Sequence, residues 1–94
     1  MRIPHTLKIG GHTVKVVQTK MEDNPQSLMG KFDTTRNILT IDAELVQSQK
    51  EVTLFHEILH AINTEWDNQI NGHALLESIA QQLYQVLSDN NMLK

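Results

Sequence analysis

The sequence predicts an α+β domain, in which a small sheet packs on two helices. As far as Asp42, apolar and polar residues alternate in short runs, a period of two that is typical of strands. Beyond Asp42, apolar residues recur every three or four positions, which is typical of amphipathic helices. Strands that precede helices in this way favour the α+β class. Because 94 residues leave room for one small domain, we expect residues 1–94 to form a single minimal domain.

The strand half, at about residues 3–41, is expected to form a mostly antiparallel sheet of three or four strands. Its alternating segments lie at residues 6–9, 12–17, 28–33 and 38–41. Gly10 and Gly11 separate the first two segments and predict a β-hairpin, because glycine adopts the positive φ angles of tight turns. A polar loop containing Asn24-Pro25 and a turn at residues 34–37 separate the remaining segments.

Two helices are expected, at about residues 48–65 and 73–88. Ser48 followed by Glu51 fits a capping box, which places the start of the first helix at Ser48. Apolar residues spaced by three and four then form the core-facing side of this helix, which Leu54 and Ile58 widen: Val52, Phe55, Leu59, Ile62 and Trp66. The second helix has a similar face from Leu76 to Leu87 and follows the turn residues Asn71-Gly72.

The composition argues against several classes of function. The chain has no cysteine, which excludes a disulfide scaffold, a cysteine-ligated zinc site and an iron–sulfur site. Its net charge of −3 argues against direct binding of nucleic acid, since proteins that bind the phosphate backbone are usually basic. No apolar run is long enough to span a membrane, and the first residues lack the apolar region of a signal peptide. We therefore expect a cytoplasmic protein without a membrane partner, and the oligomeric state stays open.

One motif carries chemistry. His56-Glu57-Ile58-Leu59-His60, the pattern H-E-x-x-H, lies within the first predicted helix. Residues four apart share a helix face with Cβ atoms about 5–6 Å apart, so both imidazoles can bind one Zn²⁺ at about 2.0–2.1 Å. Glu57 is rotated about 100° from His56, which places it outside the ligand pair but within reach of a water on the metal. We therefore expect His56 and His60 to bind a metal, with Glu57 as the general base.

A catalytic zinc site needs a third protein ligand. The candidates that follow the motif are Glu65, Asp67, His73 and Glu77. Glu65 and Asp67 follow His60 too closely to reach the metal without breaking the helix. Glu77 lies on the second helix, which would return antiparallel after the Asn-Gly turn, and it borders the apolar face near the small Ala80. Glu77 is therefore the expected third ligand.

The motif His56-Glu57-x-x-His60 with a glutamate on a following helix resembles the gluzincin branch of zinc peptidases. The small size is similar to that of the minigluzincins, and residues 53–62 (TLFHEILHAI) resemble short phage and prophage proteins of the ImmA/IrrE type of metallopeptidase. The resemblance covers roughly residues 38–90. It implies zinc-dependent hydrolysis of a peptide or protein substrate, with His56, His60 and Glu77 as zinc ligands and Glu57 as the base that activates water.

The resemblance implies further roles. The strand formed by Ile38, Leu39, Thr40 and Ile41 would be the edge along which a peptide substrate lies. Many gluzincins carry an aspartate four residues after the ligand glutamate, where it orients a ligand histidine. Gln81 stands at this position, and its amide oxygen accepts a hydrogen bond more weakly than a carboxylate does. His73 and Tyr84 share a helix face with Glu77 and are candidates to stabilise the developing oxyanion.

Two interpretations from other classes stay open. The first is a metal-binding regulatory or interaction protein of phage origin with little or no turnover, since a chain this small has little room for specificity pockets. The second is a structural domain that binds no metal and in which Glu77 faces water. Peptide hydrolysis that depends on Glu57 would separate an enzyme from the first class, and a metal-dependent shift in melting temperature would exclude the second.

Overall fold

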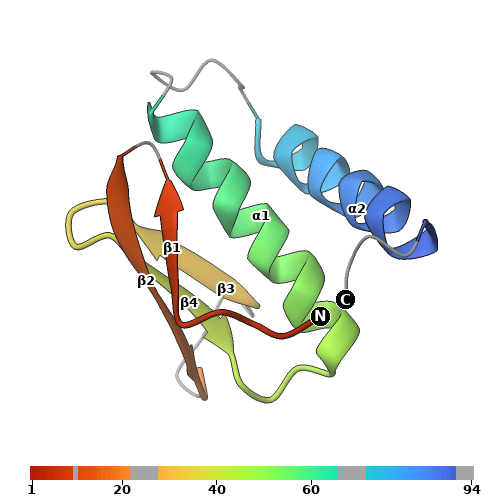
Figure 1. Cartoon of the computed structure of the whole chain (residues 1–94), viewed down its shortest axis with the longest axis horizontal. Coiled ribbons are helices and arrows are strands. Elements are labelled where there is room, and N and C mark those ends of the chain that lie inside the picture. Colours follow the sequence, from red (N-terminus) through yellow and green to blue (C-terminus); the bar gives the residue numbers. More distant parts are fainter. Residues whose placement is uncertain (10, 22–27, 66–71, 91–94) are drawn as a thin grey trace.

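The computed structural model describes residues 1–9, 11–21, 28–65 and 72–90 and confirms the α+β fold (Figure 1). The strands come first along the chain: β1 (Thr6–Ile9), β2 (His12–Thr19), β3 (Gly30–Asp33) and β4 (Ile38–Asp42). Two helices follow, α1 (Gln47–Glu65) and α2 (His73–Asp89). The predicted hairpin is present, because Ile9 pairs with His12 across the turn and Gly11 has a φ of 83°.

The strands lie in the order β1-β2-β4-β3, with β4 parallel to β2 and antiparallel to β3. The sheet is therefore mixed, although two of its three pairings are antiparallel. The prediction that Ile38, Leu39, Thr40 and Ile41 form an edge strand is wrong, because β4 has a neighbour on both sides. Leu39 and Ile41 are fully buried in this interior strand, whereas β3 takes the edge and carries the charged Lys31 and Asp33.

Both ends of β3 are fixed. The Asp33 carboxylate accepts hydrogen bonds from the backbone N–H groups of Thr35 and Arg36 at 3.0 and 3.2 Å, and Asn37 closes this turn with a φ of 55°. Just before β3, the Met29 carbonyl accepts a hydrogen bond from a backbone N–H at the end of β4 at 2.9 Å. The edge strand is therefore held in place at the point where it borders the site described below.

The first helix begins at Gln47, and the predicted capping box is absent. The Val46 carbonyl accepts the first helical hydrogen bond at 3.0 Å, so Ser48 lies inside the first turn rather than at the cap. Glu51 is buried and accepts a hydrogen bond from Gln47 Nε2 at 3.0 Å, while its Oε2 lies 3.5 Å from the amine of Met1. Glu51 thus ties the start of the chain to α1, a contact that a local sequence pattern does not contain.

The core lies between the sheet and α1. Its buried side chains are Ile3, Val14, Val16, Leu39, Ile41 and Leu54. Among the described residues, α2 contacts α1 but not the sheet, and the two helices lie side by side in antiparallel directions (Figure 1). Ala80 is fully buried on α2, as expected of a small residue where two helices approach closely.

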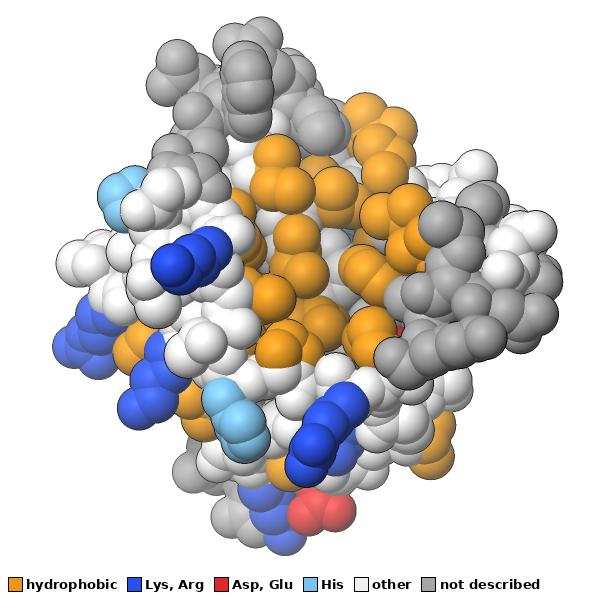
Figure 2. Space-filling model, viewed as in Figure 1, with side chains coloured by type: hydrophobic (Ala, Val, Ile, Leu, Met, Phe, Trp, Pro, Cys, Tyr) orange, Lys and Arg blue, Asp and Glu red, His pale blue; other side chains and the backbone are white. Residues whose placement is uncertain are grey.

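The surface shown in Figure 2 carries a broad cluster of apolar side chains near its centre, where α1 lies in Figure 1. Large apolar side chains that stay exposed on the two helices include Ile62, Leu75 and Leu83. Neither helix, within the part of the chain that the structure describes, combines the length and the apolar character needed to cross a bilayer.

Candidate metal centre and its cleft

The two histidines of the motif meet on one face of α1. Their Nε2 atoms are 3.0 Å apart, and their ring centroids are 4.7 Å apart. Two nitrogen ligands at about 2.0–2.1 Å from a tetrahedral zinc ion are separated by about 3.3 Å. His56 and His60 therefore stand at close to the separation that two ligands of one ion require.

The third imidazole of the site is that of His73, the first residue of α2. Gly72 precedes it with a φ of 99°, a conformation that glycine adopts without strain. The centroid of the His73 ring lies 4.6 Å from that of His56 and 5.5 Å from that of His60. One nitrogen from each ring can be chosen so that all three lie within 4.8 Å of one another. These three histidines could hold a metal ion.

The surroundings of the two histidines of α1 lower the pKa of each imidazole. Burial lowers the pKa of His56, the positive charges that His60 and His73 can carry lower it further, and the Glu77 carboxylate acts in the opposite direction. Burial also lowers the pKa of His60, with His73 as the second cause. Because a neutral imidazole is the metal ligand, lowered pKa values keep both rings ready to bind at neutral pH.

Glu57 is the buried acid beside the cluster. Its side chain is 7% exposed, and its Oε2 lies 3.8 Å from His56 Nε2. Burial raises the pKa of Glu57 to about 7. A carboxyl group with a pKa near neutrality can both take up and release a proton at physiological pH, which is what a general base requires.

The burial of Glu57 depends on a close approach of β3 to α1 at Gly30. A Cβ atom at position 30 would lie 2.6 Å from Thr53 Cγ2, 2.8 Å from the Thr40 carbonyl oxygen and 3.5 Å from Glu57 Cγ. The first two distances are too short for any side chain, so only glycine fits here without movement. Gly30 therefore lets the edge strand cover Thr53 and the stem of Glu57.

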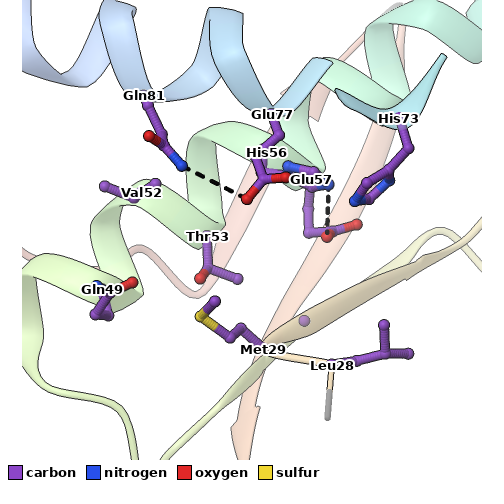
Figure 3. Close-up of a pocket in the computed structure, with 11 residues that line it drawn as sticks. Leu28, Met29, Gln49, Val52, Thr53, His56, Glu57, His73, Glu77 and Gln81 are labelled. Carbon is purple, nitrogen blue, oxygen red and sulfur yellow. Dashed lines mark hydrogen bonds and ion pairs between the residues drawn. The ribbon is translucent and has the colours of Figure 1, made fainter. Parts of the chain in front are cut away.

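A cleft of about 170 Å³ opens beside the cluster (Figure 3). Its described lining comes from the segment that leads into β3, from the first residue of β3, from α1 and from α2: Leu28, Met29, Gly30, Gln49, Val52, Thr53, His56, Glu57, His73, Glu77 and Gln81. A second and more open space of about 270 Å³ is bordered by Phe32 and His60. Glu57 and His73 line both spaces, so the candidate catalytic groups lie where the two meet.

The other predicted site residues of α2 separate into two groups. Glu77 and Gln81 line the cleft, and Gln81 Nε2 donates to Glu77 Oε1 at 3.5 Å (Figure 3). Tyr84 instead packs against Phe55 with ring centroids 6.1 Å apart, and it is not among the described residues that line the cleft. Burial alone would raise the pKa of Glu51, but hydrogen bonds from Gln47 and Tyr84 lower it overall, so the Tyr84 hydroxyl serves the helix interface.

Sequence reasoning ranked Glu77 above His73 as the third ligand, whereas the group that the structure gathers around one position contains His73. The spacing of His73 and Glu77, one helical turn apart, could have indicated that both reach the site. The lining residues Met29, Gly30, Val52 and Thr53 carry no motif that would have marked them. Trp66 and Asp67 lie outside the described residues, as does the side chain of Glu65.

Comparisons with protein-family models, with curated proteins and with solved structures give no significant match. No relative therefore supplies a role for any of these residues.

Proposed function

We propose that this protein is a zinc-dependent metallopeptidase in which Glu57 is the general base. The observation that carries the proposal is the position of a buried carboxyl group, with a pKa of about 7, beside three imidazoles that can share one metal ion. The site opens into a cleft with room for part of a substrate. The H-E-x-x-H pattern, which is typical of zinc sites, supplies two of the imidazoles and the acid.

The proposed mechanism needs a Lewis acid, which is the metal, and a general base, which is the Glu57 carboxylate. His56, His60 and His73 would hold the zinc ion, which would supply Lewis acidity towards a water molecule and the scissile carbonyl. Glu57, 3.8 Å from His56, takes a proton from the attacking water and passes it to the leaving amine. The low exposure of Glu57 keeps its carboxylate poorly solvated, so the carboxylate gains stability by accepting that proton.

We assign the third ligand to His73 rather than to Glu77. Three imidazole ligands and one open position are a known form of catalytic zinc site. Glu77 lines the cleft and is held by Gln81, so it stays the alternative that the gluzincin resemblance implies. Zinc titration calorimetry decides between them: His73→Ala should weaken binding by orders of magnitude and Glu77→Gln by much less, and the reverse ranking would restore the His-His-Glu site.

The proposed substrate is an extended peptide that lies along β3. This strand is the edge of the sheet next to the site, and Gly30 lines both the cleft and the more open space. An edge strand offers unpaired backbone groups to which a peptide can add as a further strand. Because space continues on both sides of Glu57, cleavage within a chain is favoured over removal of a terminal residue.

The test of the proposed function uses zinc-loaded protein and a mixture of quenched fluorescent peptides. Hydrolysis should require zinc, and Glu57→Gln should abolish it while zinc affinity stays within a few fold of the wild type. Gln has nearly the shape of Glu but cannot take a proton at neutral pH, so only the base is removed. If Glu57→Gln cleaves at the wild-type rate, the mechanism is wrong.

A second candidate is a metal-binding interaction protein with little turnover. The apolar surface in Figure 2 favours it, since large exposed apolar patches mark binding sites for other proteins. This candidate predicts that the protein binds zinc tightly but cleaves no peptide in the mixture.

A further inference from the structure

Two neighbouring apolar side chains remain exposed at the rim of the cleft. Leu28 and Met29 are 39% and 45% exposed, although both line the cleft. Their side chains diverge: Met29 extends beneath Thr53 towards Gln49, and Leu28 points away from it (Figure 3). The hydrogen bond at 2.9 Å from the backbone N–H of Asp42 to the Met29 carbonyl anchors this segment to the sheet.

The wall opposite Met29 belongs to α1. Val52 precedes His56 by four residues, so the two share a helix face with Cβ atoms about 5–6 Å apart. Thr53 and Gly30 close the floor between the walls, because β3 approaches α1 so closely at Gly30 that a Cβ atom there would lie 2.6 Å from Thr53 Cγ2. The apolar part of the cleft therefore begins one helical turn away from a candidate metal ligand.

The size and charge of this space define what fits. A dry apolar cavity of about 150 Å³ accommodates benzene, and this cleft measures about 170 Å³. Among the described residues that line it, none is a lysine or arginine, whereas Glu57 and Glu77 are acidic. One apolar side chain of the size of Leu, Met or Phe would fit, and an acidic side chain would lose hydration beside Met29 and Val52.

The more open space on the other side of Glu57 differs in its lining. It shares Leu28, Gly30 and His73 with the cleft, but neither Met29 nor Val52 is part of its described lining. Substitutions of Met29 and Val52 therefore alter one side of the site and leave the other intact.

We propose that Met29 and Val52 form a specificity subsite that binds one apolar side chain of a peptide, at a fixed position beside the cleaved bond. The proposal rests on the proposed peptidase function and adds the class of substrate to it. Met29 and Val52 determine specificity but take no part in proton transfer.

The test is cleavage of quenched decapeptides of Gly, Ala and Ser that carry one variable residue. Zinc-loaded wild type should cut at a constant distance from Leu, Met or Phe, about tenfold or more faster than the peptide with Asp or Ser. Met29→Glu should reverse this preference towards Lys and Arg, because the new carboxylate lies at the wall. Val46→Glu is the matched control, since Val46 is 67% exposed and not part of the cleft lining, and it should keep the wild-type preference.

A second variant, on the opposite wall, provides the test if Met29→Glu does not fold. Val52→Ala enlarges the same subsite and should move the preference from Leu towards Phe and Trp. Preferences that stay unchanged in both variants would overturn the subsite while the peptidase function stands.

A binding experiment separates failure of the subsite from failure of the proposed function. Zinc-loaded Glu57→Gln is titrated into labelled Leu and Asp decapeptides, and fluorescence anisotropy gives the two affinities. Tighter binding of the Leu peptide that Met29→Glu removes supports the subsite, even if the wild type cleaves nothing. Equal affinity for both peptides overturns the subsite.

Discussion

Glu57→Gln should stabilise the metal-free protein, and the size of the effect should depend on pH. The pKa of Glu57 is about 7 in the folded protein, against 4.5 for the exposed group, because burial penalises the charged form. A raised pKa means that the folded protein holds a proton that the unfolded chain releases between these two values. The contribution of Glu57 to stability is therefore fully present below pH 4.5 and is lost as the pH rises through 7.

The size of this effect on the free energy of unfolding follows from the shift in the pKa of Glu57. One pKa unit corresponds to about 1.36 kcal/mol, so a shift of roughly 2.5 units corresponds to about 3 kcal/mol at pH 8 as an upper bound. Gln carries no charge at any pH and does not incur this penalty. The difference in free energy of unfolding between Glu57→Gln and wild type should therefore grow from a small value at pH 5 to as much as about 3 kcal/mol at pH 8.

The assay is urea unfolding of both proteins at pH 5, 6, 7 and 8 in the presence of a chelator. The lowered pKa values of His56 and His60 also make stability depend on pH, but both proteins share this contribution and it largely cancels in the difference. Glu51→Gln is the matched control on the same helix. Because the pKa of Glu51 is lowered, its contribution is present above pH 4.5 and lost in acid, which gives the opposite slope.

A difference between Glu57→Gln and wild type that stays constant from pH 5 to pH 8 would refute the reasoning. Glu57 would then be solvated in the folded protein, and the proposed general base would lose the burial on which it depends. Saturating zinc should shrink the difference, since a nearby cation favours the carboxylate over the neutral acid.

Three further outcomes are expected. Zinc should raise the melting temperature and a chelator should lower it, because a ligand that binds only the folded state stabilises it by about 4 kcal/mol at a thousandfold excess over Kd. Zinc affinity, measured by competition titration, should hold from pH 8 to pH 6.5 and fall only at lower pH, since protons displace zinc once they bind His56 and His60, whose pKa values lie below 6.5. Gly30→Ala should destabilise the protein by about 1–3 kcal/mol through overpacking against Thr53, and Thr53→Ser in the same chain should recover part of the loss in urea unfolding.

Local signals predicted the elements of the fold but not their arrangement. Gly11 lies in the turn of the hairpin as expected, because the turn depends only on neighbouring residues. The interior position of β4 depends on which strand buries Leu39 and Ile41 best, and that is decided by packing across the whole chain. The prediction of a capping box was wrong for a similar reason. The Glu51 carboxylate accepts a hydrogen bond from Gln47 and pairs with the amine of the distant Met1.

The candidate site likewise has one part that the sequence predicts and one part that it does not. His56, Glu57 and His60 lie within one helix, so their spacing alone determined how they are arranged. The choice between His73 and Glu77 could not be made from sequence, because the two are one turn apart on α2. Which of them faces α1 depends on how far α2 slides along its neighbour, and the histidine cluster reports that position.

The metal site and the attachment of α2 are linked. Among the described residues α2 contacts α1 alone, and His73 at its start joins the two imidazoles of α1. A metal bound by all three histidines would therefore connect the helices as well as provide chemistry, and any free energy of metal binding would also stabilise their contact. Loss of the metal should in turn weaken the attachment of α2 at its His73 end, whereas Ala80 and the contact of Tyr84 with Phe55 still pack the two helices together further along α2. The same link would serve an interaction protein, in which metal binding would set the relative position of the two helices.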